Sequence, residues 1–189
     1  MDNSKNPAAP DPLAVMLEAR SVALVGASPR PGSLGARMID EVAKSSSRPR
    51  TYLVNPRYPE IGGAACYPAL DDLPEPVDLA LLAVPDPALE EQVRAAAAGG
   101  ARSAVIFGSA VESCSSVLPN SGAGFGSGAL PDSGRGLRGR ITAIARGAGM
   151  AVCGAGCMGF VNVARGLRAI GYVEPDPVPA GPVALVTHS

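Results

Sequence analysis

In the segment Ser21-Val-Ala-Leu-Val-Gly26-Ala-Ser28-Pro-Arg30-Pro-Gly32-Ser-Leu-Gly35, the order of residue types indicates the fold class of this chain. The first five residues of this segment form a short, mainly apolar run that predicts a buried β-strand. Glycines and prolines follow at once, and a helix-like pattern then runs from Ser33 to Lys44. A strand, a glycine-rich turn and a helix in this order open a βαβ unit.

The same alternation continues toward the C-terminus. Val77 to Val84 is almost continuously apolar, as expected of a parallel strand that is covered on both faces. We expect further strands at 51–54, 103–107 and 151–153, a further candidate at 167–172, and helices from Pro85-Asp86-Pro87 to about Ala98 and at 137–146. Strands separated by single helices predict an α/β fold with a doubly wound parallel sheet, a Rossmann-like domain.

Composition excludes several classes of function. Hydrophobic residues make up 47% of the chain and the formal net charge is -1. The sequence has no basic stripe with interleaved aromatic residues, which argues against a nucleic-acid partner. It also has no apolar run near the ~20 residues of a membrane span and no signal-peptide pattern, so we expect a cytoplasmic protein that is not bound to a membrane.

Changes in composition divide the chain into segments. The polar, proline-rich residues 1–19 predict a flexible leader, and residues 20–173 predict the Rossmann-like domain. Within it, the Ser/Gly-rich residues 113–136 are expected to form a mobile surface insertion. Residues 174–189 are interpreted as a proline-rich linker and the first strand of a truncated second domain.

The turn after the first strand is a candidate phosphate site. It contains Gly26, Ala27, Ser28, Arg30 and Gly32, where backbone N–H groups and a helix N-terminus favour an anion. The turn departs from the G-x-G-x-x-G pattern because Ser28 stands in place of the second glycine.

The residues at the end of the second strand narrow the choice of ligand. A dinucleotide site favours Asp or Glu there, to bind the ribose 2′-hydroxyl, but this sequence has Asn55-Pro56-Arg57. An arginine suits an additional phosphate on the ribose, which both NADP and coenzyme A carry. The residues therefore indicate a phosphorylated adenine nucleotide and leave these two ligands open.

Several motifs together resemble the CoA-binding domain of NDP-forming acyl-CoA synthetases, the family of ADP-forming acetate–CoA ligases and the succinyl-CoA synthetase α-subunit. The resemblance covers nearly everything from Arg20 onward except the insertion. It is carried by 20–28, 53–57, Gly62 and Tyr67, Leu73-Pro74, 77–85, 104–107, 144–146, Gly154-x-x-Cys157-Met-Gly159 and 181–187.

The resemblance implies which regions face coenzyme A. Gly26, Ala27, Ser28 and the following turn with Arg30 and Gly32 would face its phosphates. Asn55, Pro56 and Arg57 would lie near the adenosine end. Val84 and Pro85 would pack near the nucleotide or the pantetheine arm. None of these residues is implied to be catalytic, because this domain of the family binds rather than reacts.

The resemblance implies a ligase that makes an acyl-CoA while it converts ATP or GTP to the diphosphate through a phosphohistidine. That chemistry, and the Mg²⁺ it uses, belongs to further domains, so we expect this chain to be inactive alone and to work with a second chain that carries them. The sequence departs from the family's Gly-Pro-Asn-Cys turn, which reads Gly154-Ala-Gly-Cys157 here. It also departs from the family's glycine-phenylalanine after the fourth strand, where it reads Ser109-Ala-Val-Glu112.

Three features that could suggest catalysis or metal binding are interpreted as having neither role. His188 is the only histidine, and its position next to the C-terminus argues against catalysis. Cys157, without a neighbouring cationic residue, is expected to be a packing residue, and its C-x3-C pair with Cys153 lacks further zinc ligands. Asp71-Asp72 is expected to be a solvated turn or helix cap rather than a metal pair.

Two other functions remain open from the residues. The first is the NADP-binding domain of an oxidoreductase, against which the missing G-x-G-x-x-G pattern counts. The second is a nucleotide-sensing module that regulates a partner. The same fold serves all of these functions, so the fold alone does not choose between them.

Overall fold

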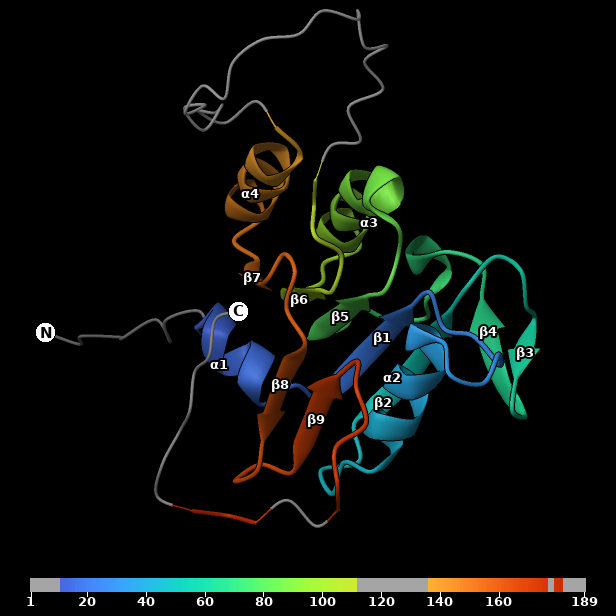
Figure 1. The fold of residues 1–189 in the computed structure, drawn as a ribbon. Helices are drawn as coiled ribbons and strands as arrows, with labels where there is room; N and C mark the ends of the chain where they lie inside the picture. The colour runs from blue at the N-terminus through green and yellow to red at the C-terminus, as the bar shows by residue number, and fades with distance from the viewer. Residues whose placement is uncertain (1–10, 112–135, 177–178, 182–189) are drawn as a thin grey trace, which may run out of the picture.

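The computed structural model describes residues 11–111, 136–176 and 179–181. Its main sheet has seven strands in the order β3-β4-β2-β1-β5-β6-β7, and all neighbours pair in parallel except β3 with β4. These strands are β1 Ser21–Val25, β2 Arg50–Val54, β3 Glu60–Ile61, β4 Ala64–Tyr67, β5 Leu79–Leu82, β6 Ser103–Ile106 and β7 Ala151–Cys153. The predicted doubly wound α/β sheet is confirmed (Figure 1).

Alternation along the strands creates two hydrophobic cores, one on each face of the sheet. In β1, Ala23 and Val25 face one core, and Val22 and Leu24 face the other. The first core is covered by α3 (Asp86–Ala98) and α4 (Leu137–Gly147), which lie together on one side of the sheet in Figure 1. Because β1 is buried on both faces, it reads as a continuous apolar run.

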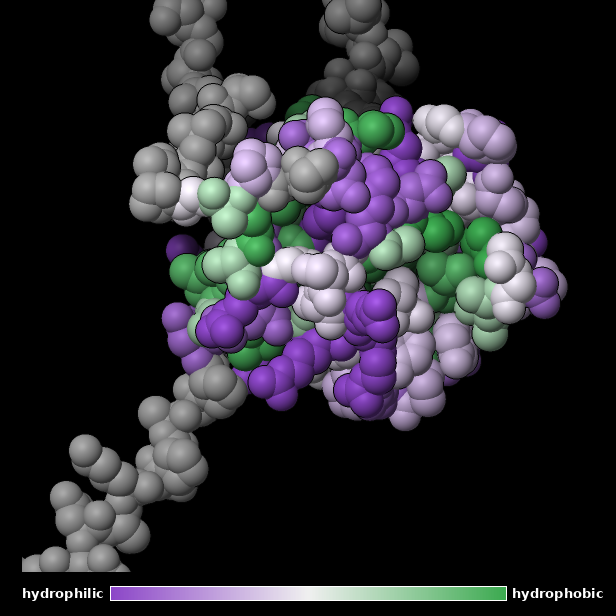
Figure 2. Space-filling view, turned by 90° about the horizontal axis from the view of Figure 1, so that it is seen from below, coloured by the Kyte–Doolittle hydropathy of each residue, from purple (hydrophilic) through white to green (hydrophobic). Residues whose placement is uncertain are grey.

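The second face is covered by α2 (Leu34–Ala43), by α1 (Pro12–Leu17) and by a separate two-stranded antiparallel sheet. This small sheet pairs β8 (Gly159–Asn162) with β9 (Leu167–Ile170). The candidate strand at 167–172 therefore exists as β9, but it belongs to a hairpin packed against α2 and not to the main sheet. Figure 2 shows the molecule from below, where hydrophobic residues on this face are exposed only in separate green areas between hydrophilic ones.

The flexible leader predicted for residues 1–19 is wrong for residues 12–17, which form α1. Asp11 caps this helix by accepting a hydrogen bond from the backbone N–H of Leu13, and Pro12 occupies its first position. Met16 and Ala19 are buried in the second core. A capping residue followed by proline is a signal for the start of a helix. The flexible leader was predicted instead because the surrounding residues are rich in proline.

The edge of the sheet contains a hairpin that the strand predictions did not include. β3 and β4 are joined by Gly62 and Gly63, both with positive φ, as a two-residue hairpin turn of this type requires. The 3-10 helix η1 (Leu70–Asp72) follows, and the Asp72 carboxylate accepts a hydrogen bond from the backbone N–H of Ala69. The interpretation of Asp71-Asp72 as a turn or cap is confirmed.

Several predictions concern residues outside the described part of the chain. They are the insertion up to residue 135, the strand at 183–186 of a second domain, and the terminal His188. Within the described residues, no helix has both the length and the apolar character needed to cross a lipid bilayer.

Candidate functional site

The register of the sheet brings three turns together at the carboxyl edge. Val25 of β1 pairs with Val54 of β2 on one side and with Leu82 of β5 on the other. The next residues along the three strands are Gly26, Asn55 and Ala83, so their turns begin side by side. β1 is the point where the chain changes direction across the sheet, and in such sheets ligands bind in the crevice outside the strand ends.

The turn from β1 to α2 holds Gly26, Ala27, Ser28, Arg30 and Gly32, the predicted phosphate-facing residues. Gly26 has φ +89, and a Cβ atom there would lie 2.3 Å from the carbonyl oxygen of Ala83. Only glycine fits this position, because the conformation and the contact both exclude a side chain. The turn therefore lies directly against the end of β5.

The N-terminus of α2 is packed against the same turn. A Cβ atom on Gly35 would lie 2.2 Å from the carbonyl oxygen of Gly26 and 2.9 Å from the backbone nitrogen of Ser28. Ser33 caps the helix by accepting a hydrogen bond from the backbone N–H of Ala36 at 3.1 Å. This close packing directs the positive end of the α2 dipole at the turn, which is the arrangement that favours a phosphate.

Asn55 connects the second turn to the first. Its side-chain amide donates a hydrogen bond to the carbonyl oxygen of Ala27 at 2.7 Å, and its Oδ1 atom accepts one from the backbone N–H of Arg57 at 3.0 Å. The side chains of Pro56 and Arg57 are exposed at the rim. The backbone of Asn55-Pro56-Arg57 is therefore held beside the phosphate turn, with the Arg57 side chain exposed to solvent.

The third turn contains Val84 and Pro85. The backbone N–H of Ala83 donates to the carbonyl oxygen of Val25 at 2.9 Å, which keeps this turn beside Gly26. Val84 is half-buried against the first core, and Pro85 is the N-cap residue of α3. All the predicted binding residues thus lie along one edge. Within the described residues, the hydrogen bonds that Arg30 and Arg57 make in their turns involve only their backbone groups.

Asp86 organises the neighbouring loop after β6, a role that the sequence analysis missed. Its carboxylate accepts hydrogen bonds from the hydroxyl of Ser109 at 2.7 Å and from the backbone N–H groups of Ala110 at 3.1 Å and Val111 at 3.0 Å. These hydrogen bonds, first of all the one from Ser109, lower the pKa of Asp86. An aspartate between two prolines at a helix start was the available signal.

Two cysteines meet beyond the end of β7. The Sγ atoms of Cys153 and Cys157 are 3.9 Å apart, and both side chains are half-buried against the second core. The packing role predicted for Cys157 agrees with this burial, but the contact between the two thiols was not predicted. The hydrogen bond from Cys153 lowers the pKa of Cys157 to about 6 and, by the same contact, raises the pKa of Cys153.

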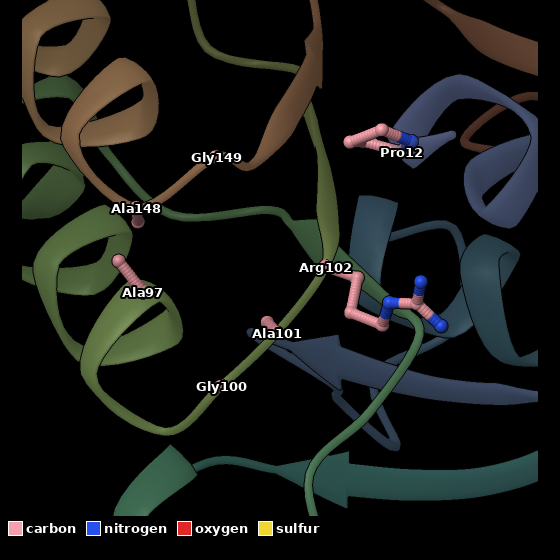
Figure 3. Close-up of a pocket in the computed structure, with 7 residues that line it drawn as sticks. All are labelled: Pro12, Ala97, Gly100, Ala101, Arg102, Ala148 and Gly149. Carbon is pink, nitrogen blue, oxygen red and sulfur yellow. The ribbon is translucent and has the colours of Figure 1, made fainter. Parts of the chain in front are cut away.

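A cavity of about 250 Å³ lies at the opposite, amino edge of the sheet (Figure 3). It is lined by Pro12 of α1, by small residues at the ends of α3 and α4, and by Arg102, the one charged residue of its lining. Ligand sites usually present several convergent polar groups, which this lining does not. None of the predicted binding residues lines this cavity, so the carboxyl edge remains the candidate site.

Comparisons with known proteins find similar domains. A family model described as a CoA binding domain matches residues 20–163. A trans-feruloyl-CoA synthase from an unknown prokaryotic organism is 29% identical over 92% of this chain and 24% of its own length. An ADP-forming acetate–CoA ligase I of Archaeoglobus fulgidus is 29% identical over 89% of this chain and 22% of its own length.

A solved structure shares the fold. The acetyl-coenzyme A synthetase 1 of Ca. Korarchaeum cryptofilum, in complex with phosphate and ADP, superposes with a TM-score of 0.70 and 24% identity, over 89% of this chain and 32% of the larger chain. The chain thus spans about a quarter of the length of the curated relatives that it matches.

Proposed function

This chain belongs to the family of CoA-binding domains, and we propose on that premise that its carboxyl-edge turns hold coenzyme A by the 3′-phospho-ADP half. The observation that carries the proposal is the hydrogen bond between Asn55 and Ala27, which fixes the turn after β2 beside the turn after β1. One nucleotide that spans both turns therefore meets a preformed surface.

The proposed contacts divide between the turns. The pyrophosphate lies on the turn from Gly26 to Gly32, where the capped N-terminus of α2 supplies N–H groups and a favourable dipole. The adenosine lies toward Asn55 and Pro56, and the exposed Arg57 pairs with the 3′-phosphate. Val84 and Pro85 contact the nucleotide or the start of the pantetheine arm, beside Gly26.

The 3′-phosphate contact is tested by comparing CoA with dephospho-CoA in calorimetric titrations. Dephospho-CoA should bind roughly five- to tenfold more weakly, because one charge-assisted contact with an exposed arginine contributes about 1 kcal/mol. Arg57→Ala should remove most of this difference. Arg146→Ala, an exposed arginine at the end of α4, should leave it intact. Equal affinities for both ligands in the wild type contradict the contact.

We further propose that this domain is the CoA-holding part of an ADP-forming acyl-CoA ligase. The sequence has a single histidine, His188, which is outside the described residues, and the carboxyl edge as described offers none to carry a phosphoryl group. ATP or GTP and Mg²⁺ would act only with ligase domains supplied elsewhere, for example by a second chain.

This assignment is tested with labelled ATP, acetate, CoA and magnesium. The chain alone should give neither acetyl-CoA nor an acid-labile phosphoenzyme, because phosphoryl transfer needs groups positioned around the transferred phosphate. A phosphoenzyme that His188→Asn abolishes would contradict the proposal that phosphoryl transfer takes place in other ligase domains. Activity that appears on addition of a chain with the remaining ligase domains supports it.

A further inference from the structure

The two thiols beyond β7 are close enough to react with each other. Cys153 is the last residue of β7, and the Sγ atom of Cys157 lies 3.9 Å from its Sγ atom. The segment between them contains Gly154 and Gly156, both with positive φ, so the chain turns back on itself. Formation of a disulfide requires the sulfur atoms to approach further, to about 2.05 Å, through side-chain rotation and a shift of this glycine-rich loop.

The surroundings assign different roles to the two sulfur atoms. Cys153 donates its hydrogen bond to Cys157, which stabilises a thiolate on Cys157. When protonated, Cys157 has the carbonyl oxygens of Ile106 at 3.4 Å and Cys153 at 3.5 Å as acceptors. Cys66 is different, because it is buried and burial raises the pKa of its thiol. Cys157 is therefore the better nucleophile among the described cysteines.

Metal binding does not explain the pair. Within the residues that the structure describes, no group of three or more His, Cys, Asp or Glu side chains is arranged to hold a metal ion. Zinc sites in proteins need three or four such ligands. We therefore consider the reactions that the two thiols can undergo with each other.

We propose that Cys153 and Cys157 form a redox-sensitive modification site that low-molecular-weight disulfides convert to an intramolecular disulfide. The Cys157 thiolate attacks one sulfur of the disulfide R–S–S–R, which forms a mixed disulfide and releases R–S⁻, a group that takes up a proton. The Cys153 sulfur, after losing its proton, then attacks Sγ of Cys157 and releases the second R–S⁻. Two protein thiols are oxidised and one small disulfide is reduced to two thiols.

This site does not depend on the proposed function, because neither step needs a bound nucleotide. Oxidation would join the end of β7 to the following loop, whose Gly156 N–H donates to the carbonyl oxygen of Gly108. A disulfide there would thus act on the loop after β6 at the same edge of the sheet.

The test uses the full reduced chain and oxidised glutathione at pH 7, followed by acid quenching, alkylation in denaturant and trypsin digestion. Cleavage after Arg146 and Arg165 gives the peptide 147–165, which contains Cys153, Cys157 and no other cysteine. This peptide should become unalkylated and lose the mass of two hydrogen atoms. Cys66, in the separate peptide 58–94, serves as the internal control and should stay alkylated.

Two variants test the order of attack. In Cys153→Ser the reaction should stop at a stable glutathione adduct on Cys157. In Cys157→Ser the adduct on Cys153 should form at least about tenfold more slowly, because burial still raises the pKa of that thiol and no neighbouring thiol lowers it. A wild-type peptide 147–165 that stays fully alkylated overturns the proposal without recourse to a variant. Equal rates in the two variants overturn Cys157 as the attacking thiol.

Discussion

The side-chain amide of Asn55 donates a 2.7 Å hydrogen bond to the backbone carbonyl of Ala27 and so joins two turns that are far apart in the sequence. One turn follows β1 and the other follows β2, and the parallel register of these strands brings their ends to the same level. Because the hydrogen bond runs from a side chain to a backbone group, it fixes the path of the turn from β1 to α2. The candidate site is thus preorganised by a residue that also lines it.

Asn55→Ala should weaken CoA binding by roughly fivefold, because the loss of one hydrogen bond costs about 1 kcal/mol and loosens the phosphate turn. Calorimetric titration of CoA measures this effect. Asn162→Ala is the matched control, since its amide also donates to a backbone carbonyl, that of Leu17, but at the contact between the hairpin and α1. It should lower the thermal midpoint slightly and leave CoA affinity unchanged. The reverse pattern would place the ligand elsewhere.

Gly35→Ala should destabilise the fold by about 1 to 3 kcal/mol and abolish tight CoA binding. The added methyl group would meet the carbonyl oxygen of Gly26 at 2.2 Å, so α2 must move away from the turn. Gly147→Ala makes the same change at the end of α4, where no atom lies within 4 Å of the new Cβ. It should leave the midpoint equal or raise it. Chemical denaturation compares the two, and an equal effect would refute the tight packing of α2.

A buried ion pair attaches the β8–β9 hairpin to α2. Arg168 donates from Nε at 3.0 Å and from a terminal nitrogen at 2.5 Å to the carboxylate of Glu41, and both side chains are almost fully buried. Burial acts to raise the pKa of Glu41, but hydrogen bonds from Lys44 and Arg168 outweigh it, and the net effect lowers this pKa. The hairpin therefore depends on a charged contact for its position.

Arg168→Met should cost about 2 to 3 kcal/mol of stability at pH 7, because it removes two charge-assisted hydrogen bonds from the buried Glu41 carboxylate and leaves Lys44 as its remaining ion-pair partner. Glu41→Gln combined with Arg168→Met should cost clearly less than the sum of the two single variants. Urea denaturation of all four proteins measures this coupling. Additive effects would show that the ion pair does not hold the hairpin in place.

Asp86→Asn should lower stability by about 1 kcal/mol at pH 7 through weaker hydrogen bonds to the loop at Ser109 to Val111. The folded pKa of Asp86 lies below its ordinary value of 3.8, so its contribution is present above that pH and is lost as pH falls through the folded pKa. The difference between wild type and variant should therefore shrink below about pH 3.8. Asp71→Asn, an exposed control on η1, should leave the stability at pH 7 nearly unchanged. A difference that stays constant with pH would contradict this role.

The sequence predicted the elements whose signals are local. The apolar runs of β1, β5 and β6, and the Gly26 turn with its following helix, were all placed correctly. The hairpin of β3 and β4 was also visible in Gly62-Gly63 between two short strands, although it was not predicted. What could not be predicted depends on distant contacts, since Glu41 and Arg168 become partners only when the hairpin folds back on α2.

The candidate site shows the same division. The glycine pattern and Asn55-Pro56-Arg57 were identifiable from residue types next to strand ends, because parallel strands place such turns at one edge. The bond from Asn55 to Ala27, the anchoring of the loop by Asp86 and the approach of Cys153 to Cys157 depend on side-chain directions that a linear pattern does not contain.

Recognition of coenzyme A at the carboxyl edge, rather than of another phosphorylated adenine nucleotide, distinguishes the proposed function from that of an oxidoreductase domain. This preference is measured by side-by-side calorimetric titrations of the wild-type chain with CoA and with NADP, since both ligands carry a pyrophosphate and an additional ribose phosphate. The domain should bind CoA more tightly, and excess CoA should displace any bound NADP. Tighter binding of NADP would contradict the assignment and favour an oxidoreductase domain instead.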